Sequence, residues 1–225
     1  KSPSLCHLVS CCQLGISAFV GEISSGVITV TFNMIILNLA GNTGVAAYGV
    51  VANTSLVAVA LFNGIAQGSQ PLISRSYGRG EEQNVRSLLK MSLTTAFGLG
   101  VLLVLFIFFS APAVTAVFNS EHDLQLAAYA DSGLKLYFIG FLFAGINIVG
   151  TAALSAVESV KYAFCASISR GFVATIFFAF VLSACFKMTG IWLAFPAAEF
   201  ATMFITLSGL LYFTKQKGGM YHAKN

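Results

Sequence analysis

The feature that most constrains this chain is a series of charge-poor apolar stretches, each long enough to cross a bilayer. A spanning helix needs about 20 mostly apolar residues. Because the hydrocarbon region offers no water to backbone N–H and C=O groups, we expect each stretch to be helical. Six stretches satisfy this requirement, at 13–40, 45–73, 87–110, 127–156, 162–186 and 191–213. The predicted fold class is an all-α integral membrane protein with a bundle of six transmembrane helices.

The composition supports a membrane location for the whole bundle. Hydrophobic residues make up 57% of the chain and charged residues only 9%, whereas an ordinary soluble domain carries roughly 25% charged residues. Too little charge remains to cover a soluble core. We therefore expect a polar lead-in at 1–12, a six-helix membrane lobe at 13–213 and a cytoplasmic tail at 214–225.

The orientation follows from the basic residues, because Lys and Arg in short loops mark the cytoplasmic side. They cluster after the second stretch, beside the link between the fourth and fifth stretches, and in the tail. These residues are Arg75, Arg79, Arg86, Lys90, Lys161, Arg170, Lys215, Lys217 and Lys224. The other three links contain Lys187 as their only basic residue. We predict a multi-pass protein of the plasma membrane with both termini in the cytoplasm.

A polar stripe runs along the first stretch. Glu22, Gly26, Thr29 and Asn33 fall on one face at 100° per residue. A carboxylate at membrane depth usually faces a cavity, a partner or a pathway. One interpretation is therefore that Glu22 binds a cation or exchanges a proton beside a cavity. The alternative is that Glu22 hydrogen-bonds a neighbouring helix and fixes its packing.

A second polar face occurs in the second stretch. Asn63, Gln67 and Gln70 stand at i, i+4 and i+7, with Gly64 and Gly68 beside them. Amide side chains need partners in lipid, so this face is not expected to look outward. It would either line a substrate pathway or hold two helices together, since small residues allow helices to approach closely.

The last stretch contains a second carboxylate, Glu199, three residues after Pro196. Proline lacks an N–H group and tends to kink a helix, so the two residues could form a polar hinge on the ion pathway. The favoured interpretation places Glu199 near a membrane boundary, where it reaches water. Asn147 in the fourth stretch is a weaker pathway candidate.

Other kinds of chemistry lack their residues. The three histidines, His7, His122 and His222, lie in expected loops or tails, which provides no intramembrane metal ligand or Ser-His pair. No G-x-S-x-G motif is present. The basic residues form no stripe with interleaved aromatics, so nucleic acid is not an expected partner. We predict neither an enzyme nor a metal or organic cofactor.

Several motifs resemble the MATE (multidrug and toxic compound extrusion) family, in its bacterial branch. They cover nearly the whole chain in the expected order. The motifs are EISSG at 22–26, GNTGVAAYGV at 41–50, NGIAQGSQPL at 63–72, YG at 77–78 and GIWLAFPAAE at 190–199.

The resemblance implies that the chain corresponds to helices seven to twelve of a transporter with two six-helix lobes. The amino-terminal lobe would be a missing partner. Such transporters export small organic molecules, usually cationic, in exchange for H⁺ or Na⁺ through a cavity between the lobes. The acidic residue that many members carry in helix seven would be Glu22 here.

Two other functions stay open at this point. A lipid-linked saccharide flippase of the same superfamily would share the architecture and use a more basic central cavity. A membrane fragment without transport activity would also fit, since half of the transporter is absent from this sequence.

Overall fold

A computed structural model of the chain describes the backbone of residues 5–120 and 122–222 and the side chains of residues 26–120, 122–159 and 161–214. The described chain is almost entirely helical. In chain order, its elements are α1 (Leu5–Gly78), α2 (Glu82–Phe118), α3 (Leu124–Phe138), α4 (Phe141–Ala156), α5 (Val160–Ile168), the π-helical turn η1 (Ser169–Val173) and α6 (Ala174–His222).

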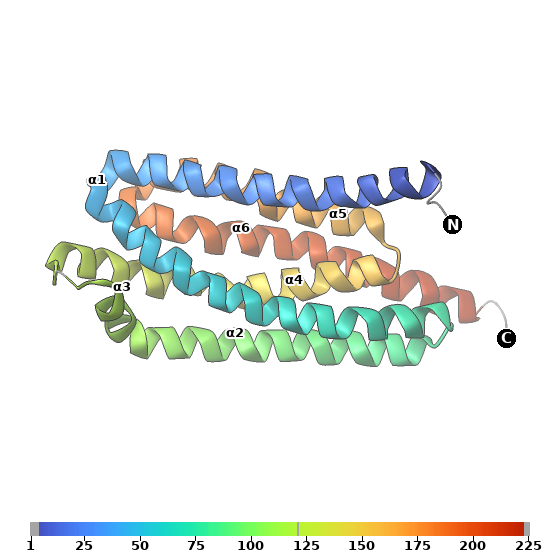
Figure 1. Cartoon of the computed structure of the whole chain (residues 1–225). Helices are drawn as coiled ribbons and strands as arrows, with labels where there is room; N and C mark the ends of the chain where they lie inside the picture. Colours follow the sequence, from blue (N-terminus) through green and yellow to red (C-terminus); the bar gives the residue numbers. More distant parts are fainter. Residues whose placement is uncertain (1–4, 121, 223–225) are drawn as a thin grey trace.

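Two of these helices reverse direction at a sharp break. The backbone of α1 leaves the helical region at Gly41 (φ 64°, ψ −157°), and that of α6 leaves it at Lys187 (φ 51°, ψ −128°). Figure 1 shows α1 running along the bundle and returning after the break, and α6 folding back in the same way. A positive φ is readily adopted by glycine, which explains why the first reversal falls on Gly41.

The breaks turn a few long helices into a six-helix bundle. Within the described part of the chain, three helices are long and apolar enough to cross a membrane, namely Gly26–Gly78, Glu82–Phe118 and Lys161–Thr214. The pair α3 and α4, bent by 46°, forms a fourth span if it is counted as one. The first and third of these contain the breaks, so each supplies two antiparallel arms. The predicted all-α membrane bundle is confirmed.

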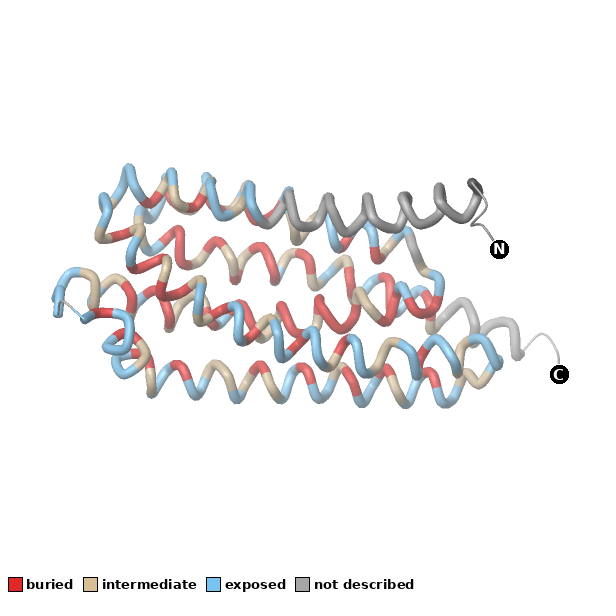
Figure 2. The backbone as a smooth tube through the Cα atoms, viewed as in Figure 1, coloured by how far each residue is buried: buried red, intermediate tan, exposed pale blue. Residues whose placement is uncertain are grey.

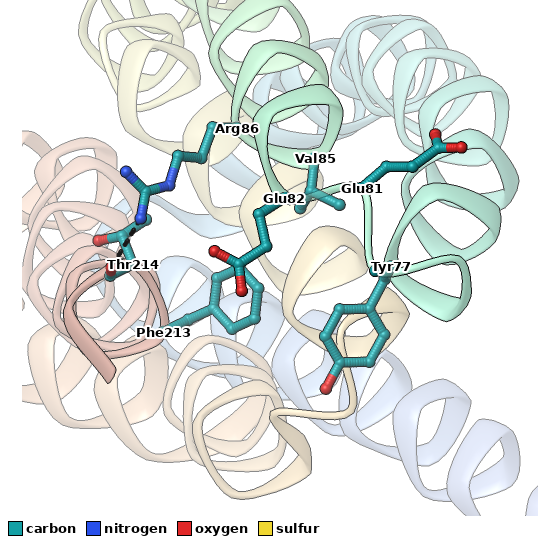
Figure 3. A pocket seen from close by; sticks show the side chains of 8 residues that line it. Tyr77, Glu81, Glu82, Val85, Arg86, Phe213 and Thr214 are labelled. Atoms are coloured by element: carbon teal, nitrogen blue, oxygen red, sulfur yellow. Dashed lines mark hydrogen bonds between the residues drawn. The ribbon is translucent and has the colours of Figure 1, made fainter. Parts of the chain in front are cut away.

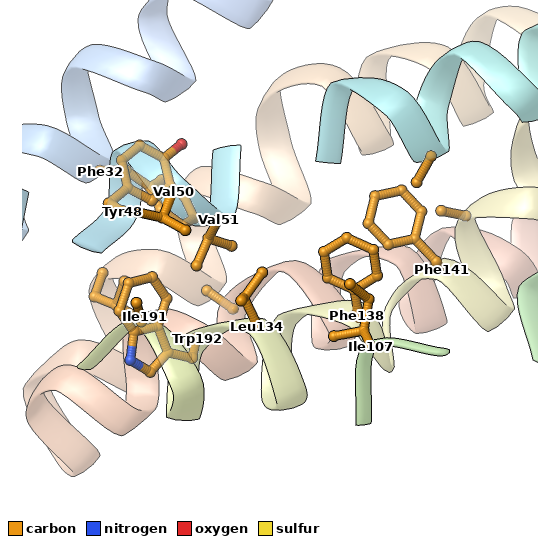
Figure 4. Close-up of a cluster of buried hydrophobic side chains, with 14 of the residues drawn as sticks. Phe32, Tyr48, Val50, Val51, Ile107, Leu134, Phe138, Phe141, Ile191 and Trp192 are labelled. Carbon is orange, nitrogen blue, oxygen red and sulfur yellow. The ribbon is translucent and has the colours of Figure 1, made fainter. Parts of the chain in front are cut away.

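The centre of the bundle is occupied by α4, which packs against α1, α2, α5 and α6. Large side chains from α1, α2, α3, α4 and α6 meet in one buried cluster, including Phe32, Tyr48, Phe138, Phe141 and Trp192 (Figure 4). The rings of Phe62 and Phe141 stack with centroids 6.1 Å apart. Because lipid tails are as apolar as these side chains, close packing rather than exclusion of water favours this association.

The outer surface is apolar as well. Exposed side chains include Leu102, Phe106, Phe109, Phe177 and Phe204, and Figure 2 shows exposed positions along the outside of α2. Fully buried positions include Asn147, Glu199, Thr202 and Thr206. An apolar exterior around buried polar groups is the arrangement expected of a protein dissolved in lipid.

At one end of the bundle, α1, α2 and α6 meet (Figure 3). Arg86 Nη2 donates a hydrogen bond of 3.3 Å to the carbonyl of Thr214, and the Tyr77 and Phe213 rings lie 5.9 Å apart. The hollow between them has a volume of about 10 Å³, roughly the room needed by one water molecule. The contact fixes the end of α6 beside the α1–α2 turn.

Two departures from the expected spans concern the link after α2 and the helix that follows it. We expected a link at 111–126, but α2 continues past Pro112 to Phe118. The link is shorter because Asn119 closes it: its Nδ2 donates to the Asp123 carbonyl (2.8 Å) and its Oδ1 accepts from the Asp123 N–H (2.9 Å). The expected continuous helix at 127–156 is divided at Gly140. The division into lead-in, membrane lobe and tail stays a prediction.

We predict that Gly190→Ala destabilises the fold. An added methyl group would overlap the Leu182 carbonyl, and this contact involves backbone that cannot rotate away. Gly98→Ala is the matched control, because nothing lies within 4 Å of a side chain added there. The thermal unfolding midpoint of the purified protein in detergent should fall for Gly190→Ala and stay unchanged or rise for Gly98→Ala. Equal midpoints for the two variants would contradict the close packing at the Lys187 break.

Candidate functional site

A cluster of hydrogen-bonded polar side chains lies inside the bundle, where η1, α4 and α6 meet. Its centre is the Glu199 carboxylate, which is only 2% exposed. Arg170 Nε donates to Glu199 Oε1 at 2.6 Å, and Asn147 Nδ2 donates to Glu199 Oε2 at 2.7 Å. The same amide group of Asn147 also donates to the Glu199 backbone carbonyl at 2.8 Å. Both carboxylate oxygens therefore have a donor.

Threonine and serine hydroxyls extend this cluster. Thr206 Oγ1 donates to Asn147 Oδ1 at 2.9 Å, and the hydroxyls of Ser169 and Thr202 lie 3.2 Å apart. Glu199, Thr202 and Thr206 stand at i, i+3 and i+7 on α6, so they share one helix face. We call Arg170, Glu199, Asn147, Thr202 and Thr206 the Glu199 cluster.

Arg170 is held in place by an irregular helical turn. It belongs to η1, a π-helical segment, and Thr175 Oγ1 donates to the Arg170 carbonyl at 2.7 Å, five residues back. Single π-helical turns inside α-helices occur frequently at functional sites. The turn shifts the register of the helix at the residue whose charge meets Glu199.

The electrostatics of the cluster favour a direct ion pair between Arg170 and Glu199. An isolated charge at membrane depth is costly, and such residues pair with one another or face a cavity. The Arg170 side chain is 31% exposed and Glu199 is 2% exposed. Arg170 therefore reaches from the edge of the bundle to a carboxylate that has no contact with water of its own.

The structure overturns two sequence-based expectations about these residues. Glu199 does not reach water near a boundary, because it is buried and paired with Arg170. Arg170 does not mark the cytoplasmic end of its helix. It lies ten residues after the start of α5 at Val160, about 15 Å along the axis at 1.5 Å per residue, which is about half the hydrocarbon thickness.

The structure describes only part of the polar stripe that the sequence predicts on the first arm of α1. The side chain of Glu22 lies outside the described residues. Thr29 is exposed and hydrogen-bonds the Tyr48 side chain, and Asn33 is half-buried. Thr29 and Asn33 form no hydrogen bond to the Glu199 cluster within the described residues.

The second predicted polar face lies on the outside of this lobe. Asn63 and Gln67 are exposed on the second arm of α1, and Gln70 is half-buried. The exposed pair is therefore free to contact another protein surface or a water-filled cavity. Of the seven predicted pathway residues whose side chains the structure describes, Asn147 and Glu199 are the two that hydrogen-bond each other.

Arg170, Thr202 and Thr206 were missed by the sequence analysis. Two signals could have revealed them. The i, i+3, i+7 spacing of Glu199, Thr202 and Thr206 is a polar helix face, and Arg170 lies inside the stretch 162–186 rather than beside it.

Long apolar helices around a buried charged cluster define the class of multi-pass helical membrane proteins. The model of the MatE family matches residues 17–181. The chain therefore belongs to the MatE family of transporters. No curated protein sequence matches the chain significantly.

Solved structures agree with this family in their fold. The chain resembles an inward-facing multidrug resistance MATE family transporter of the MOP superfamily (TM-score 0.87, 18% identity, 96% of this chain and 50% of that chain). It resembles an outward-facing structure of such a transporter (TM-score 0.85, 17% identity, covering 96% and 49%). It also resembles a MOP superfamily transporter from Pyrococcus furiosus, whose binding pocket of reversed polarity suggests a different function (TM-score 0.80, 17% identity, covering 96% and 48%). The chain spans about half the length of these proteins, as one lobe would.

We predict that removing the charge of Arg170 destabilises the protein more than removing the charge of Glu199. Removing one partner of a buried ion pair costs about 3–5 kcal/mol. Arg170→Gln leaves Glu199 buried without its counter-charge and should approach this cost. Glu199→Gln should cost less, because Arg170 is partly exposed. The free energy of unfolding, measured in lipid bicelles, tests this order.

The double variant Arg170→Gln/Glu199→Gln completes the test. It removes both charges, so it should be more stable than the sum of the single effects implies. Glu158→Gln removes a carboxylate from an exposed turn and serves as the control. Additive single effects would mean that the two charges are not coupled.

Proposed function

We propose that this chain is the carboxyl-terminal lobe of a secondary multidrug efflux antiporter, which exports organic cations in exchange for H⁺ or Na⁺. The observation that supports this proposal is the buried Glu199 carboxylate, paired with Arg170 within a segment that is long and apolar enough to span a membrane. Ionisable residues at this depth commonly serve ion or substrate pathways. The missing amino-terminal lobe would complete the transporter.

Ion binding would be coupled to a conformational change because the ion and Arg170 compete for the Glu199 carboxylate. Arg170 Nε holds Glu199 Oε1, and Asn147 holds Glu199 Oε2. A proton or Na⁺ that neutralises the carboxylate weakens its attraction for Arg170. Because Arg170 sits in η1 and Glu199 in α6, this exchange would alter how these two helices are held together. Such a change biases one of two states of an alternating-access transporter.

The substrate pathway would run along the polar side chains of α1. Asn63 and Gln67 are exposed on its second arm, while Thr29 and Asn33 lie on its first. In a complete transporter these side chains would face a cavity shared with the second lobe. Glu22 would supply a further ion-binding carboxylate on the same arm as Thr29, as the family resemblance implies.

The lipid-linked saccharide flippase is the second candidate. Arg170 at membrane depth favours it, since a flippase would use a more basic cavity. The likeness to the Pyrococcus furiosus transporter, whose pocket suggests a different function, is a reason to test it. The ion pair with Glu199 neutralises Arg170, however, and this neutrality favours the antiporter.

The proposed location is the plasma membrane with both termini in the cytoplasm. Arg75 and Arg79 lie at the end of the bundle where α1 turns into α2, and Arg86 contacts Thr214 at the same end. The break of α6, which contains Lys187, and the start of α3, which Asp123 caps, lie at the opposite end (Figure 1). The end of the bundle with more basic residues would be cytoplasmic by the positive-inside rule.

We predict that Glu199→Gln and Glu22→Gln each abolish ion-coupled efflux while leaving membrane insertion intact. Both changes remove an ionisable group but keep the size of the side chain. Cells would express this chain with and without a matching amino-terminal lobe, and ethidium efflux would be followed under separately imposed proton and sodium gradients. The ion whose imposed gradient drives ethidium efflux is the coupling ion.

Glu158→Gln, at an exposed turn, should transport like the wild type. Efflux that needs both lobes supports a half-transporter. Wild-type efflux by both Glu22→Gln and Glu199→Gln would refute the assigned carboxylates. No efflux in any combination would favour the flippase or a membrane fragment without transport activity.

A further inference from the structure

The Asn147 side chain is completely buried and fully engaged in the Glu199 cluster. Asn147 is 0% exposed. Its Nδ2 donates to Glu199 Oε2 at 2.7 Å and to the Glu199 backbone carbonyl at 2.8 Å, while its Oδ1 accepts from Thr206 Oγ1 at 2.9 Å. A primary amide carries two N–H donors, and both are used here. Asn147 therefore has no donor left for any other group.

Two of these bonds hold the Asn147 amide in one orientation, whatever the charge on Glu199. The Glu199 backbone carbonyl only accepts hydrogen bonds, so Nδ2 rather than Oδ1 has to face it. At the other end of the amide, the Thr206 hydroxyl makes its shorter contact with Oδ1, the longer one being 3.3 Å to the Thr202 carbonyl. Turning the amide over would bring Oδ1 against the Glu199 carbonyl, and an unpaired buried polar group is costly. An N–H group of Asn147 therefore always faces Glu199 Oε2.

This fixed donor makes the two oxygens of the Glu199 carboxyl group unequal. When a carboxylate takes up a proton, one oxygen becomes an O–H donor and the other stays an acceptor. Oε2 faces the Asn147 N–H at 2.7 Å and is best placed to stay the acceptor. The proton then belongs on Oε1.

The neighbour of Oε1 is the one member of the pair that can withdraw. Arg170 Nε donates to Oε1 at 2.6 Å, so an O–H group on Oε1 would set two donors against each other. The Arg170 side chain is 31% exposed and sits on the irregular turn η1, whereas Asn147 is buried on α4. Protonation also removes the negative charge that holds the guanidinium. Arg170, not Asn147, is therefore the group that leaves.

The other titratable groups near Glu199 do not change this order. In the described part of the chain, Arg170 on η1 and Tyr137 on α3 interact electrostatically with Glu199. A phenol is uncharged near neutral pH. Arg170 is therefore the charge that responds when Glu199 is neutralised.

We infer that Asn147 and Thr206 are positioning residues that direct a proton to Glu199 Oε1, so that each protonation of Glu199 releases Arg170. The inference rests on the proposed ion exchange at Glu199 and specifies its steps. An O–H bond forms on Oε1 with a proton from water at the edge of the bundle, and the hydrogen bond from Arg170 Nε breaks. The Asn147 bonds persist, so α4 stays joined to α6 while η1 is set free.

The oxygens of the cluster suit a proton better than Na⁺. Transporters coordinate Na⁺ with oxygen ligands that include free backbone carbonyls. Here the Glu199 carbonyl is occupied by Asn147 Nδ2, and Asn147 Oδ1 is occupied by Thr206. A proton needs only one oxygen, and Oε1 supplies it.

The test follows Glu199 and Arg170 separately in the full 225-residue chain, held in lipid nanodiscs. Infrared difference spectra on acidification record the C=O band of protonated Glu199, identified by its absence from Glu199→Gln. Magnetic resonance of isotope-labelled arginine records the Nε–H group of Arg170, identified by its absence from Arg170→Lys. In the wild type both signals should change with one midpoint pH. Added NaCl at constant pH should change neither, with choline chloride as the control for ionic strength.

The variants test the positioning role. Asn147→Leu keeps the size of the side chain but removes the donor at Oε2, so either oxygen can take the proton. The carboxyl band should still form, while the Arg170 signal loses its link to it. Thr206→Val should weaken the link in the same way, and Thr206→Ser should restore it. Thr206→Val keeps the test valid if Asn147→Leu fails to fold.

Ser208→Ala changes an exposed hydroxyl on the same helix and should behave like the wild type. If Asn147 and Thr206 only stabilised the fold, their variants would lower the thermal unfolding midpoint and leave the two signals linked.

The outcomes separate this inference from the antiporter proposal. Signals that separate in the wild type, or that stay linked in both Asn147→Leu and Thr206→Val, would overturn the positioning role and leave ion exchange at Glu199 standing. Na⁺ that releases Arg170 at constant pH without a carboxyl band would overturn the proton site but support an antiporter driven by Na⁺. If neither acid nor Na⁺ changes either signal, both the inference and the role of Glu199 in coupling fail.

Discussion

The absence of water from the hydrocarbon region is the constraint on which the rest of this structure depends. Each backbone N–H and C=O group at that depth needs a partner in the protein, and helices provide one for nearly all of them. The same constraint acts on side chains. Glu199 is buried, and both of its carboxylate oxygens accept hydrogen bonds, from Arg170 and Asn147. Burying a carboxylate away from water is costly, so it has to be stabilised by particular neighbours. Because these neighbours lie on η1 and α4, their contacts with Glu199 hold η1, α4 and α6 together.

The helices themselves were predictable, because the length and hydropathy of a spanning segment are set by the thickness of a bilayer. Six apolar stretches in the sequence correspond to the arms and spans of the bundle. Their ends were less predictable. A link was expected at 111–126, but α2 continues to Phe118 and ends where Asn119 binds Asp123. That contact depends on two residues whose pairing has no signature in the hydropathy of the sequence.

The candidate site was predictable only in part. A carboxylate within an apolar stretch stands out in the sequence, so Glu199 was identified, and Asn147 was noted as a weaker candidate. Their environment depends on which helices become neighbours. Arg170 and Glu199 are 29 residues apart and Asn147 and Glu199 are 52 apart, and no periodicity within one helix relates them. The sequence therefore suggested water as the partner of Glu199, whereas the fold supplies Arg170 and Asn147.

The bend between α3 and α4 divides one span into two helices with different neighbours. Asp131 lies before the bend and accepts a hydrogen bond from Lys135 on the same helix, while Asn147 lies after it and donates to Glu199 on α6. The bend falls at Gly140, where a side chain would stand 3.1 Å from Pro196 Cα and closer still to the Phe195 ring. The break in this span thus packs directly against the proline of α6, three residues before Glu199. The bend of one span therefore lies against a proline inside another helix. After the 46° bend, Asn147 on α4 donates to the buried Glu199 carboxylate, while α3 packs beside α2.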